Sequence, residues 1–331
     1  MGGDHGVTVV VPAALNALKK HLDISLILVG DHDAVSHELM VNNAGISNRL
    51  SIHHASQQVE MTDTASTALR GKKDSSMRVG INLVKEGLAD ACVSSGNTGA
   101  LMATARFVLK TLPGIDRPAI CSALPTTQGH THMLDLGANV DSSANSIFEF
   151  ALMGSELARA VDNIPNPTVG LLNIGEEEIK GNERVKEAGR LLADSDLNYT
   201  GFIEGDDIYK GKVDVVVCDG FVGNVALKSS EGVAYMFGYY IRQEFKRNLL
   251  TKLIGLISRP VIHRFRKRMD PREYNGASLL GLQGIIIKSH GSADTFSFTN
   301  AINVAVAEVE KNVPGQISAH LENLLAGEES A

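Results

Sequence analysis

Three turns rich in glycine, serine and asparagine carry the groups best suited to chemistry in this chain. Each follows a short apolar run and precedes a helical pattern: residues 94–98 (SSGNT), 175–182 (GEEEIKGN) and 219–224 (DGFVGN). The free amides and the dipole at a helix N-terminus bind anions. Because three such turns occur in one chain, we predict one shared anion site, with Gly223 and Asn224 at the start of a helix.

Alternating strands and helices must position these turns. Apolar runs predict strands at 24–29, 89–93, 119–124, 133–136, 169–173, 201–204, 213–218 and 284–288, and helical patterns cover 145–161 and 224–247. Too few residues separate 119–124 from 133–136 for a crossover helix, so these two strands should form an antiparallel hairpin. The sequence therefore predicts a three-layer α/β/α sandwich with a mixed, mostly parallel sheet.

Composition is that of a globular protein with a large core. The chain has 331 residues, of which 44% are apolar and 21% charged. No linker or repeat marks a boundary, so we expect a single catalytic unit over 1–331, whether of one lobe or two. Cys92, Cys121 and Cys218 lie in apolar runs, which favours reduced thiols. With no secretory signal or long apolar span visible, we expect a cytoplasmic protein.

Residues 242–268 form a basic amphipathic segment on an acidic chain. The net charge is −7 overall, but this segment carries nine basic residues against Glu244 alone, a local +8. Apolar residues recur there at helical spacing, and Pro260 should divide the segment into two helices. The residues expected to make contacts are Lys246, Arg247, Leu253, Ile254, Ile257, Arg264, Arg266 and Lys267. They could cover the core or a dimer partner, lie on an anionic membrane, or dock an acidic protein.

Six motifs in order give the chain a resemblance to a known family. They are residues 1–4 (MGGD), 95–100 (SGNTGA), 135–139 (DLGAN), 175–182 (GEEEIKGN), 202–205 (FIEG) and 219–224 (DGFVGN). Together they span nearly the whole chain, which resembles the PlsX family of acyl-ACP:phosphate acyltransferases. The resemblance implies an architecture similar to isocitrate dehydrogenase and phosphotransacetylase.

Two departures from the family pattern are visible. Members usually carry a short apolar strand before MGGD, whereas Met1 here begins the motif, so the first strand is missing or starts upstream. Asn275 and Ser278 stand where the family more often has Gly and Pro, which we interpret as loop variation.

The resemblance implies an acyl transfer. Inorganic phosphate attacks the thioester of a long-chain acyl-ACP, giving acyl phosphate for phosphatidic acid synthesis and releasing the carrier thiol. Phosphate is already a charged nucleophile and a thiolate leaves readily, so the protein must mainly hold phosphate and stabilise the oxyanion. The family also implies a homodimer, peripheral association with the inner face of the cell membrane, and a downstream membrane glycerol-phosphate acyltransferase as a possible partner.

Site roles follow from this chemistry. Lys180 would neutralise developing charge, Asn224 would donate a hydrogen bond, and Asp219 would orient a neighbour. The residues expected to bind phosphate or substrate are Asp4, Ser95, Gly96, Asn97, Thr98, Gly223 and His290. The position of Lys180 just after a buried strand favours a place in the ligand crevice.

Plainer interpretations stay open for these residues. Ser95, Asn97 and Thr98 are common helix-capping residues. Lys180 could form a surface ion pair with the acidic run 176–178.

Other functions fit the sequence less well. An NAD-dependent hydroxy-acid dehydrogenase of the same architecture would need clustered acidic metal ligands and an arginine clamp, which we do not find. A non-enzymatic membrane-surface scaffold leaves the three turns unexplained. The pair His130 and His132, like His5 and His290, is not spaced with a cysteine or carboxylate as a metal site. We therefore predict no metal, no cofactor and no nucleic-acid partner.

Overall fold

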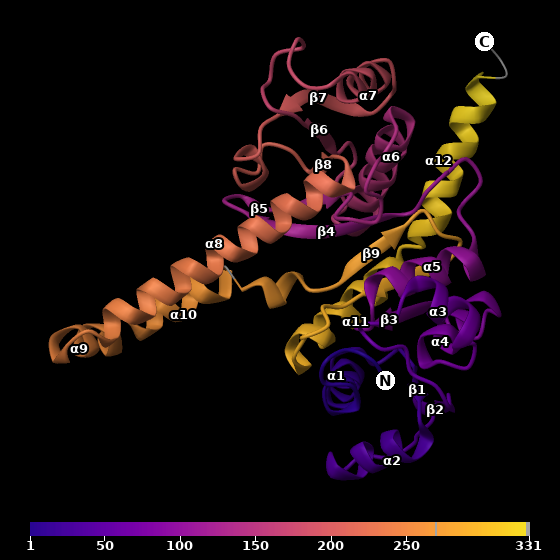
Figure 1. Ribbon diagram of the computed structural model, residues 1–331, viewed down its shortest axis with the longest axis vertical. Coiled ribbons are helices and arrows are strands. Elements are labelled where there is room, and N and C mark those ends of the chain that lie inside the picture. The colour runs from indigo at the N-terminus through magenta and orange to yellow at the C-terminus, as the bar shows by residue number, and fades with distance from the viewer. Residues whose placement is uncertain (269, 329–331) are drawn as a thin grey trace.

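The fold is built on an eight-stranded mixed sheet, described by a computed structural model that covers residues 1–268 and 270–328. The strand order is β3-β10-β9-β4-β5-β8-β6-β7, and β1 and β2 form a separate parallel pair (Figure 1). The strands are β1 (Leu26–Gly30), β2 (Leu50–His54), β3 (Ala91–Ser94), β4 (Ala119–Thr126), β5 (Gly129–Leu134), β6 (Thr168–Leu172), β7 (Asn198–Ile203), β8 (Val215–Val217), β9 (Ala277–Leu280) and β10 (Ile285–Lys288). Within the described residues five pairings are parallel and three antiparallel, so the predicted mixed, mostly parallel sheet is confirmed.

Helices cover both faces of this sheet. They are α1 (Val7–Lys20), α2 (His32–Val41), α3 (Ala65–Gly71), α4 (Ser76–Lys85), α5 (Thr98–Leu109), α6 (Ala144–Val161), α7 (Glu183–Ala193), α8 (Gly220–Lys246), α9 (Leu249–Ile257), α10 (Arg259–Arg268), α11 (Thr295–Glu310) and α12 (Val313–Glu328), with 3₁₀ turns η1 (Asp207–Tyr209) and η2 (Pro271–Tyr274). Side chains of β10 alternate between the layers: Ile286 packs with α4 and α5, while Ile285 and Ile287 pack against α11. The α/β fold class is therefore confirmed.

The antiparallel hairpin is also confirmed, but two strands were missed. β4 and β5 pair from Ser122–Met133 to Thr126–Gly129. β2 escaped prediction because most of its residues are polar or exposed. β9 is only four residues long, and it pairs antiparallel with both β4 and β10, which makes the centre of the sheet more mixed than expected. The interpretation of Ser278 as loop variation is therefore wrong, because Ser278 pairs with Cys121 and Ile287 inside β9.

A cavity separates the two sheets. It has a volume of about 560 Å³ and is lined by residues of β1 and β3, among others. All three cysteines are free, and Cys121 and Cys218 are buried. Over residues 1–268 and 270–328, no helix is both long and apolar enough to cross a membrane.

The longest helix, α8, begins four residues earlier than predicted. Asp219 is its N-cap, accepting a hydrogen bond from the Phe221 amide at 3.0 Å. The amide of Gly223 donates to the carbonyl of Asp219 at 2.9 Å, inside the helix. The prediction that Gly223 and Asn224 lie at the helix N-terminus is therefore wrong, because Asp219 caps the helix first.

The first turn of α8 sits directly on the loop of residues 135–139. A Cβ atom at Gly223 would overlap the carbonyl oxygen of Asp135, and one at Gly220 would overlap that of Asn139. Glycine is needed at both positions because backbone meets backbone there.

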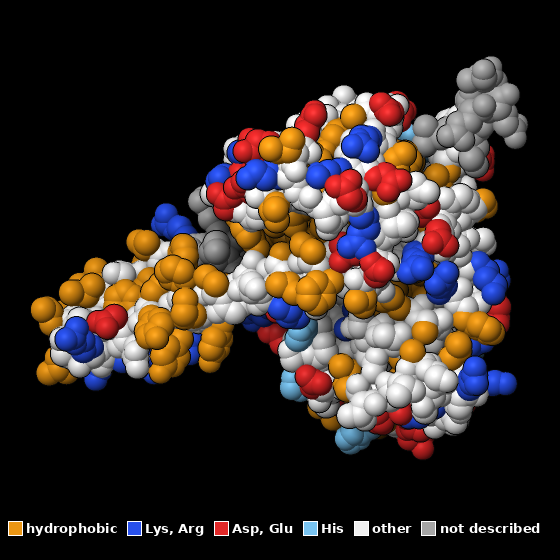
Figure 2. Space-filling view, turned by 45° about the horizontal axis from the view of Figure 1, so that its top comes forward, with side chains coloured by type: hydrophobic (Ala, Val, Ile, Leu, Met, Phe, Trp, Pro, Cys, Tyr) orange, Lys and Arg blue, Asp and Glu red, His pale blue; other side chains and the backbone are white. Residues whose placement is uncertain are grey.

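Beyond its contact with the sheet, α8 extends from the body as part of an arm, which we define as residues 231–268 (Figure 1). α9 folds against α8, with Gly255 of α9 close to Phe245. α10 then begins at Arg259, so the predicted break beside Pro260 is confirmed. The prediction of two helices over residues 242–268 is wrong, because α8 already ends at Lys246 and Asn248 caps α9 as a further helix. No residue of α9 is buried, and hydrophobic side chains cover much of the visible face of the arm (Figure 2).

The close contact of α8 gives a stability test. We expect Gly223→Ala to lower the free energy of unfolding by about 1–3 kcal/mol, because the methyl group would displace the backbone of residue 135. The matched control is Gly232→Ala in the same helix, where a Cβ atom meets nothing within 4 Å. The control should leave stability unchanged or raise it by up to about 1 kcal/mol. Urea unfolding of both variants checks this, and equal effects would contradict the packing argument.

Candidate active site

The ends of β3 and β10 meet the N-terminal turn of the chain. Lys288 and Ser94 are paired in the parallel ladder, and the Ser289 amide donates to the Ser94 carbonyl at 2.8 Å. The Asp4 amide donates to the carbonyl of Gly291 at 2.9 Å. The hydroxyl of Ser95 donates to the carbonyl of Gly2 at 3.3 Å. The fold thus brings together Asp4, Ser95, Gly96 and His290, all predicted site residues.

A buried lysine lies at the centre of this region. Lys288, the last residue of β10, is only 8% exposed, and its ammonium donates to the Ser289 carbonyl. Burial lowers the pKa of Lys288 to about 8, with Asp4 opposing the shift and Lys228 of α8 adding to it. The Lys228 ammonium, which also pairs with Glu231 at 2.8 Å, therefore lies close enough to act on the charge of Lys288. Two cations near one another favour a bound anion.

His290 contributes a hydrogen-bond donor to the same region. Burial lowers its pKa, and the charges of Lys228 and Lys288 lower it further. The Ser292 amide donates to its Nδ1 at 3.2 Å, so Nδ1 is unprotonated and Nε2 carries the hydrogen. A neutral His290 can then donate from Nε2.

Helix α8 links this region to the loop of residues 135–139. Asn224 and Lys228 are four residues apart, so they share one face of α8 about 6 Å apart along its axis. A Cβ atom at Gly137 would lie 3.3 Å from that of Asn224, which places Asn224 against this loop. Asn224 is thus next to Lys228, although it is not at the helix N-terminus.

The turn before α5 combines capping with free amides. Asn97 is the N-cap: its Oδ1 accepts from Ala100 at 3.0 Å, and its Nδ2 donates to the carbonyls of Met61 and Asp63 at 2.8 and 3.0 Å. The capping interpretation therefore describes the side chain of Asn97. The amides of Thr98 and Gly99 have no acceptor among the described residues, so both can face an anion.

Asp219 has a clear anchoring role. Besides capping α8, this buried side chain accepts from the Ser142 amide at 2.9 Å and lies 3.8 Å from Arg184. Arg184 also pairs with Asp141. These contacts tie α8 to the loop before α6, and a catalytic role for Asp219 stays a prediction.

Lys180 lies in the loop after β6, with an exposed side chain. Its carbonyl accepts from Asn173 at 3.2 Å. Its ammonium makes no ion pair within the described residues, and Glu176 pairs instead with Lys212 at 3.3 Å. No described hydrogen bond joins Lys180 to Asn97 or Asn224, so a site shared by all three stays a prediction.

Two lysines of the site were missed from the sequence. Lys288 had a usable signal, because it ends a predicted strand and strand ends line the ligand crevice of α/β folds. The only sequence signal for Lys228 was its position one helical turn after Asn224. Its importance depends on how α8 crosses the sheet, which no local pattern shows.

Comparison with known proteins identifies the chain. The model of a family described as fatty acid synthesis protein matches residues 1–316. This chain belongs to that family. The resemblance to PlsX proteins is thereby confirmed, and the chain is an acyltransferase.

Close relatives are acyltransferases by name. The phosphate acyltransferase of Nitrosococcus oceani is 64% identical over 98% of this chain and 96% of its own length. That of Methylococcus capsulatus is 62% identical over the same shares.

Solved structures share the fold. A phosphotransacetylase from Streptococcus pyogenes matches 92% of this chain and 91% of its own with a TM-score of 0.62 and 19% identity. A 4-hydroxythreonine-4-phosphate dehydrogenase from Klebsiella pneumoniae matches 93% and 96% with a TM-score of 0.54 and 14% identity. At such identities the likeness shows the fold alone.

The lowered pKa of Lys288 gives a pH test on this acyltransferase. A lysine is charged below its pKa, so Lys288 loses its charge as pH rises through about 8. We expect the affinity for inorganic phosphate, used as a probe anion, to fall by up to roughly tenfold per pH unit above that value. Titration calorimetry between pH 7.5 and 9.5 measures this. Lys288→Met should bind weakly with a flat profile, whereas a flat profile in the unaltered enzyme would remove Lys288 from the anion site.

Proposed function

We propose that this acyltransferase transfers a long-chain fatty acyl group from acyl-ACP to inorganic phosphate, giving an acyl phosphate for phosphatidic acid synthesis. The observation that carries the proposal is the meeting of the ends of β3 and β10 with the N-terminal turn, which places the buried Lys288 beside the segments of Asp4 and His290. Lys228 is near enough to act on the charge of both Lys288 and His290. Two cations and free helix amides suit a small multivalent oxyanion. The names of the relatives support phosphate as the acceptor.

The proposed reaction needs placement and charge neutralisation. Phosphate held by Lys228 and Lys288 would attack the thioester carbonyl carbon with one of its oxygens. The carbonyl electrons move onto oxygen, then return as the C–S bond breaks and the carrier thiolate leaves. Asn224 and the Nε2–H of His290 are donors suited to the transient oxyanion. Lys180 is proposed to neutralise charge that develops in this step.

We propose that α8 also pairs two copies of the chain in a homodimer. Large apolar side chains are exposed along it, including Val225, Val233, Met236, Phe237 and Tyr240. An exposed apolar surface of this extent on a helix that leaves the body is typical of an interaction site.

The outer end of the arm is proposed to lie on an anionic membrane surface, giving peripheral association with the inner face of the cell membrane. Leu253, Ile254 and Ile257 of α9 are exposed, and Lys246, Arg247 and Arg264 are exposed beside them in the chain. Arg266 and Lys267 belong to the same prediction, but their side chains lie outside the described part. A basic helix with apolar side chains binds anionic lipid. Such a location would release the product near a membrane glycerol-phosphate acyltransferase, the proposed downstream partner.

The acyl transfer is tested with purified protein and long-chain acyl-ACP, with and without phosphate. Acyl phosphate should form only when phosphate is present. Formation of NADH from a hydroxy acid and NAD would instead support the dehydrogenase hypothesis. If neither reaction occurs, the non-enzymatic scaffold is the remaining hypothesis. Lys180→Ala should abolish turnover with an unchanged circular dichroism spectrum, whereas the matched control Lys19→Ala, at an exposed position on α1, should keep full activity. Near-normal turnover of Lys180→Ala would remove Lys180 from the mechanism.

The membrane contact is tested by cosedimentation with vesicles rich in anionic lipid. We expect Leu253→Glu with Ile257→Glu to abolish binding, because carboxylates would be carried into the interface. Leu22→Glu is the control, since Leu22 is 79% exposed but lies after α1. Vesicle binding that is retained by the double variant would contradict the proposal. Binding of the unaltered chain to acyl carrier protein but not to vesicles would also contradict it.

The dimer is tested by analytical sedimentation. Both variants should sediment as dimers, and a monomer of the unaltered chain would contradict the proposed dimer.

A further inference from the structure

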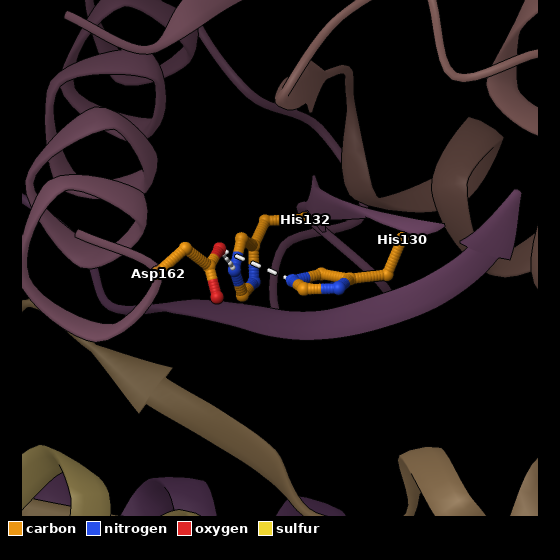
Figure 3. Close-up of side chains that lie close together, drawn as sticks. All are labelled: His130, His132 and Asp162. Carbon is orange, nitrogen blue, oxygen red and sulfur yellow. Dashed lines mark hydrogen bonds and ion pairs between the residues drawn. The ribbon is translucent and has the colours of Figure 1, made fainter. Parts of the chain in front are cut away.

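Two histidines of β5 and the aspartate that ends α6 form a compact cluster (Figure 3). His130 and His132 are two residues apart on a strand, so their side chains share one face. Asp162 is the C-cap of α6. One carboxylate oxygen of Asp162, Oδ2, lies 3.1 Å from Nε2 of His130 and 2.7 Å from Nε2 of His132. The rings are edge to face, with centroids 5.2 Å apart.

The distances between the three candidate ligand atoms are close to those in a metal coordination sphere. All of them lie within 4.8 Å of one another. Zinc bonds nitrogen and oxygen ligands at about 2.0–2.2 Å, which in a tetrahedral site puts neighbouring ligand atoms roughly 3.3 Å apart. The two hydrogen-bonded distances, 3.1 and 2.7 Å, are shorter than this by about 0.2 and about 0.6 Å. Rotation of the side chains that separates the carboxylate oxygen from the two imidazoles would therefore admit an ion.

The surroundings hold the cluster in place and leave it accessible. The side chains of His132 and Asp162 are 9% and 17% exposed, and that of His130 is 37% exposed, so solvent reaches one side. The amide of His132 is fixed by the Asp214 carbonyl at 2.8 Å. The carboxylate of Asp214 is already bonded to Thr168, through its amide and its hydroxyl, so it does not take part in the cluster.

The charge state also suits a cation. Burial would raise the pKa of Asp162, but hydrogen bonds from His130 and His132 hold it well below its usual range. The hydrogen bond to Asp162 raises the pKa of His130. The carboxylate is therefore charged at neutral pH and offers a cation a negatively charged ligand.

We propose that His130, His132 and Asp162 bind one Zn²⁺ ion through both Nε2 atoms and Oδ2, with water in the open position. This proposal departs from the prediction of no metal made from the sequence, because Asp162 is 30 residues from His132 in the chain and meets it only in the fold. Imidazole and carboxylate ligands suit borderline divalent metals such as zinc. The ion would join the β4–β5 hairpin to the end of α6. This site lies near the start of β5, whereas Asp135 follows the end of the same strand, so the ion would act on stability rather than in acyl transfer.

Binding is tested on the full chain after removal of metal with a chelator. Titration with Zn²⁺ should give one ion per chain, and Co²⁺ should give the intense visible absorption of a tetrahedral site. His130→Ala, His132→Ala and Asp162→Asn should each weaken Zn²⁺ binding by at least about tenfold, since even changes around a ligand cost 10–100-fold. His37→Ala, an exposed histidine on α2, should bind as the unaltered chain does.

Thermal unfolding provides a second readout that is independent of catalysis. Zn²⁺ should raise the melting temperature of the unaltered chain and of His37→Ala, but not that of the three cluster variants. His130→Ala is the variant least able to disturb folding, because its side chain is the most exposed of the three. No bound ion in the unaltered chain, or a stoichiometric ion that survives all three substitutions, would overturn the proposal.

Discussion

The contact between the loop of residues 135–139 and the first turn of α8 is the constraint on which the site depends. The buried carboxylate of Asp135 accepts hydrogen bonds from the amides of Ile120, Gly137, Ala138 and Asn139 and from the Asn139 side chain. Burial raises the pKa of Asp135, and these hydrogen bonds oppose the shift. The loop is thereby folded around one side chain, and α8 can approach it only because Gly220 and Gly223 have no Cβ atom.

Once seated on this loop, α8 determines where its other groups lie. Ala226 and Leu227 pack against the same core cluster as Ala277 of β9, and Lys228 is the next residue of the helix. The same helix therefore holds Asn224 against the loop and brings Lys228 to Lys288, which comes from a strand pair of the other half of the sheet. A single helix thus brings together groups that are distant in the sequence, since Lys228 and Lys288 are 60 residues apart. The path of α8 across the sheet determines which groups lie near Asn224 and Lys228.

The sequence predicted the architecture well because strands such as 213–218 and 284–288 are strongly apolar and helices such as 145–161 are strongly periodic. The prediction that α8 starts at Gly223 and Asn224 was wrong because the start of a helix depends on which residue caps it. Asp219, four residues before Gly223, is that cap. The site was predicted in part: Asp4, Ser95 and His290 do meet, whereas the lysines beside them were missed. Lys228 comes near Lys288 only through tertiary packing. His132 and Asp162, 30 residues apart, likewise meet only in the fold. Local pattern cannot report contacts of this kind.

The length of α8 also bears on what meets the end of the arm. Lys228 and Lys246 are separated by eighteen residues of one helix, a distance of about 27 Å along its axis. A carrier protein docked only at the outer end would have to reach back over that length to place its thioester beside Lys228 and Lys288. A membrane surface faces no such demand, since it presents no reacting group to the site. The apolar side chains of α9 also suit lipid better than they suit a strongly acidic protein. The helix geometry therefore supports the proposal that the outer end of the arm contacts lipid, and under that proposal a carrier protein would dock closer to the body.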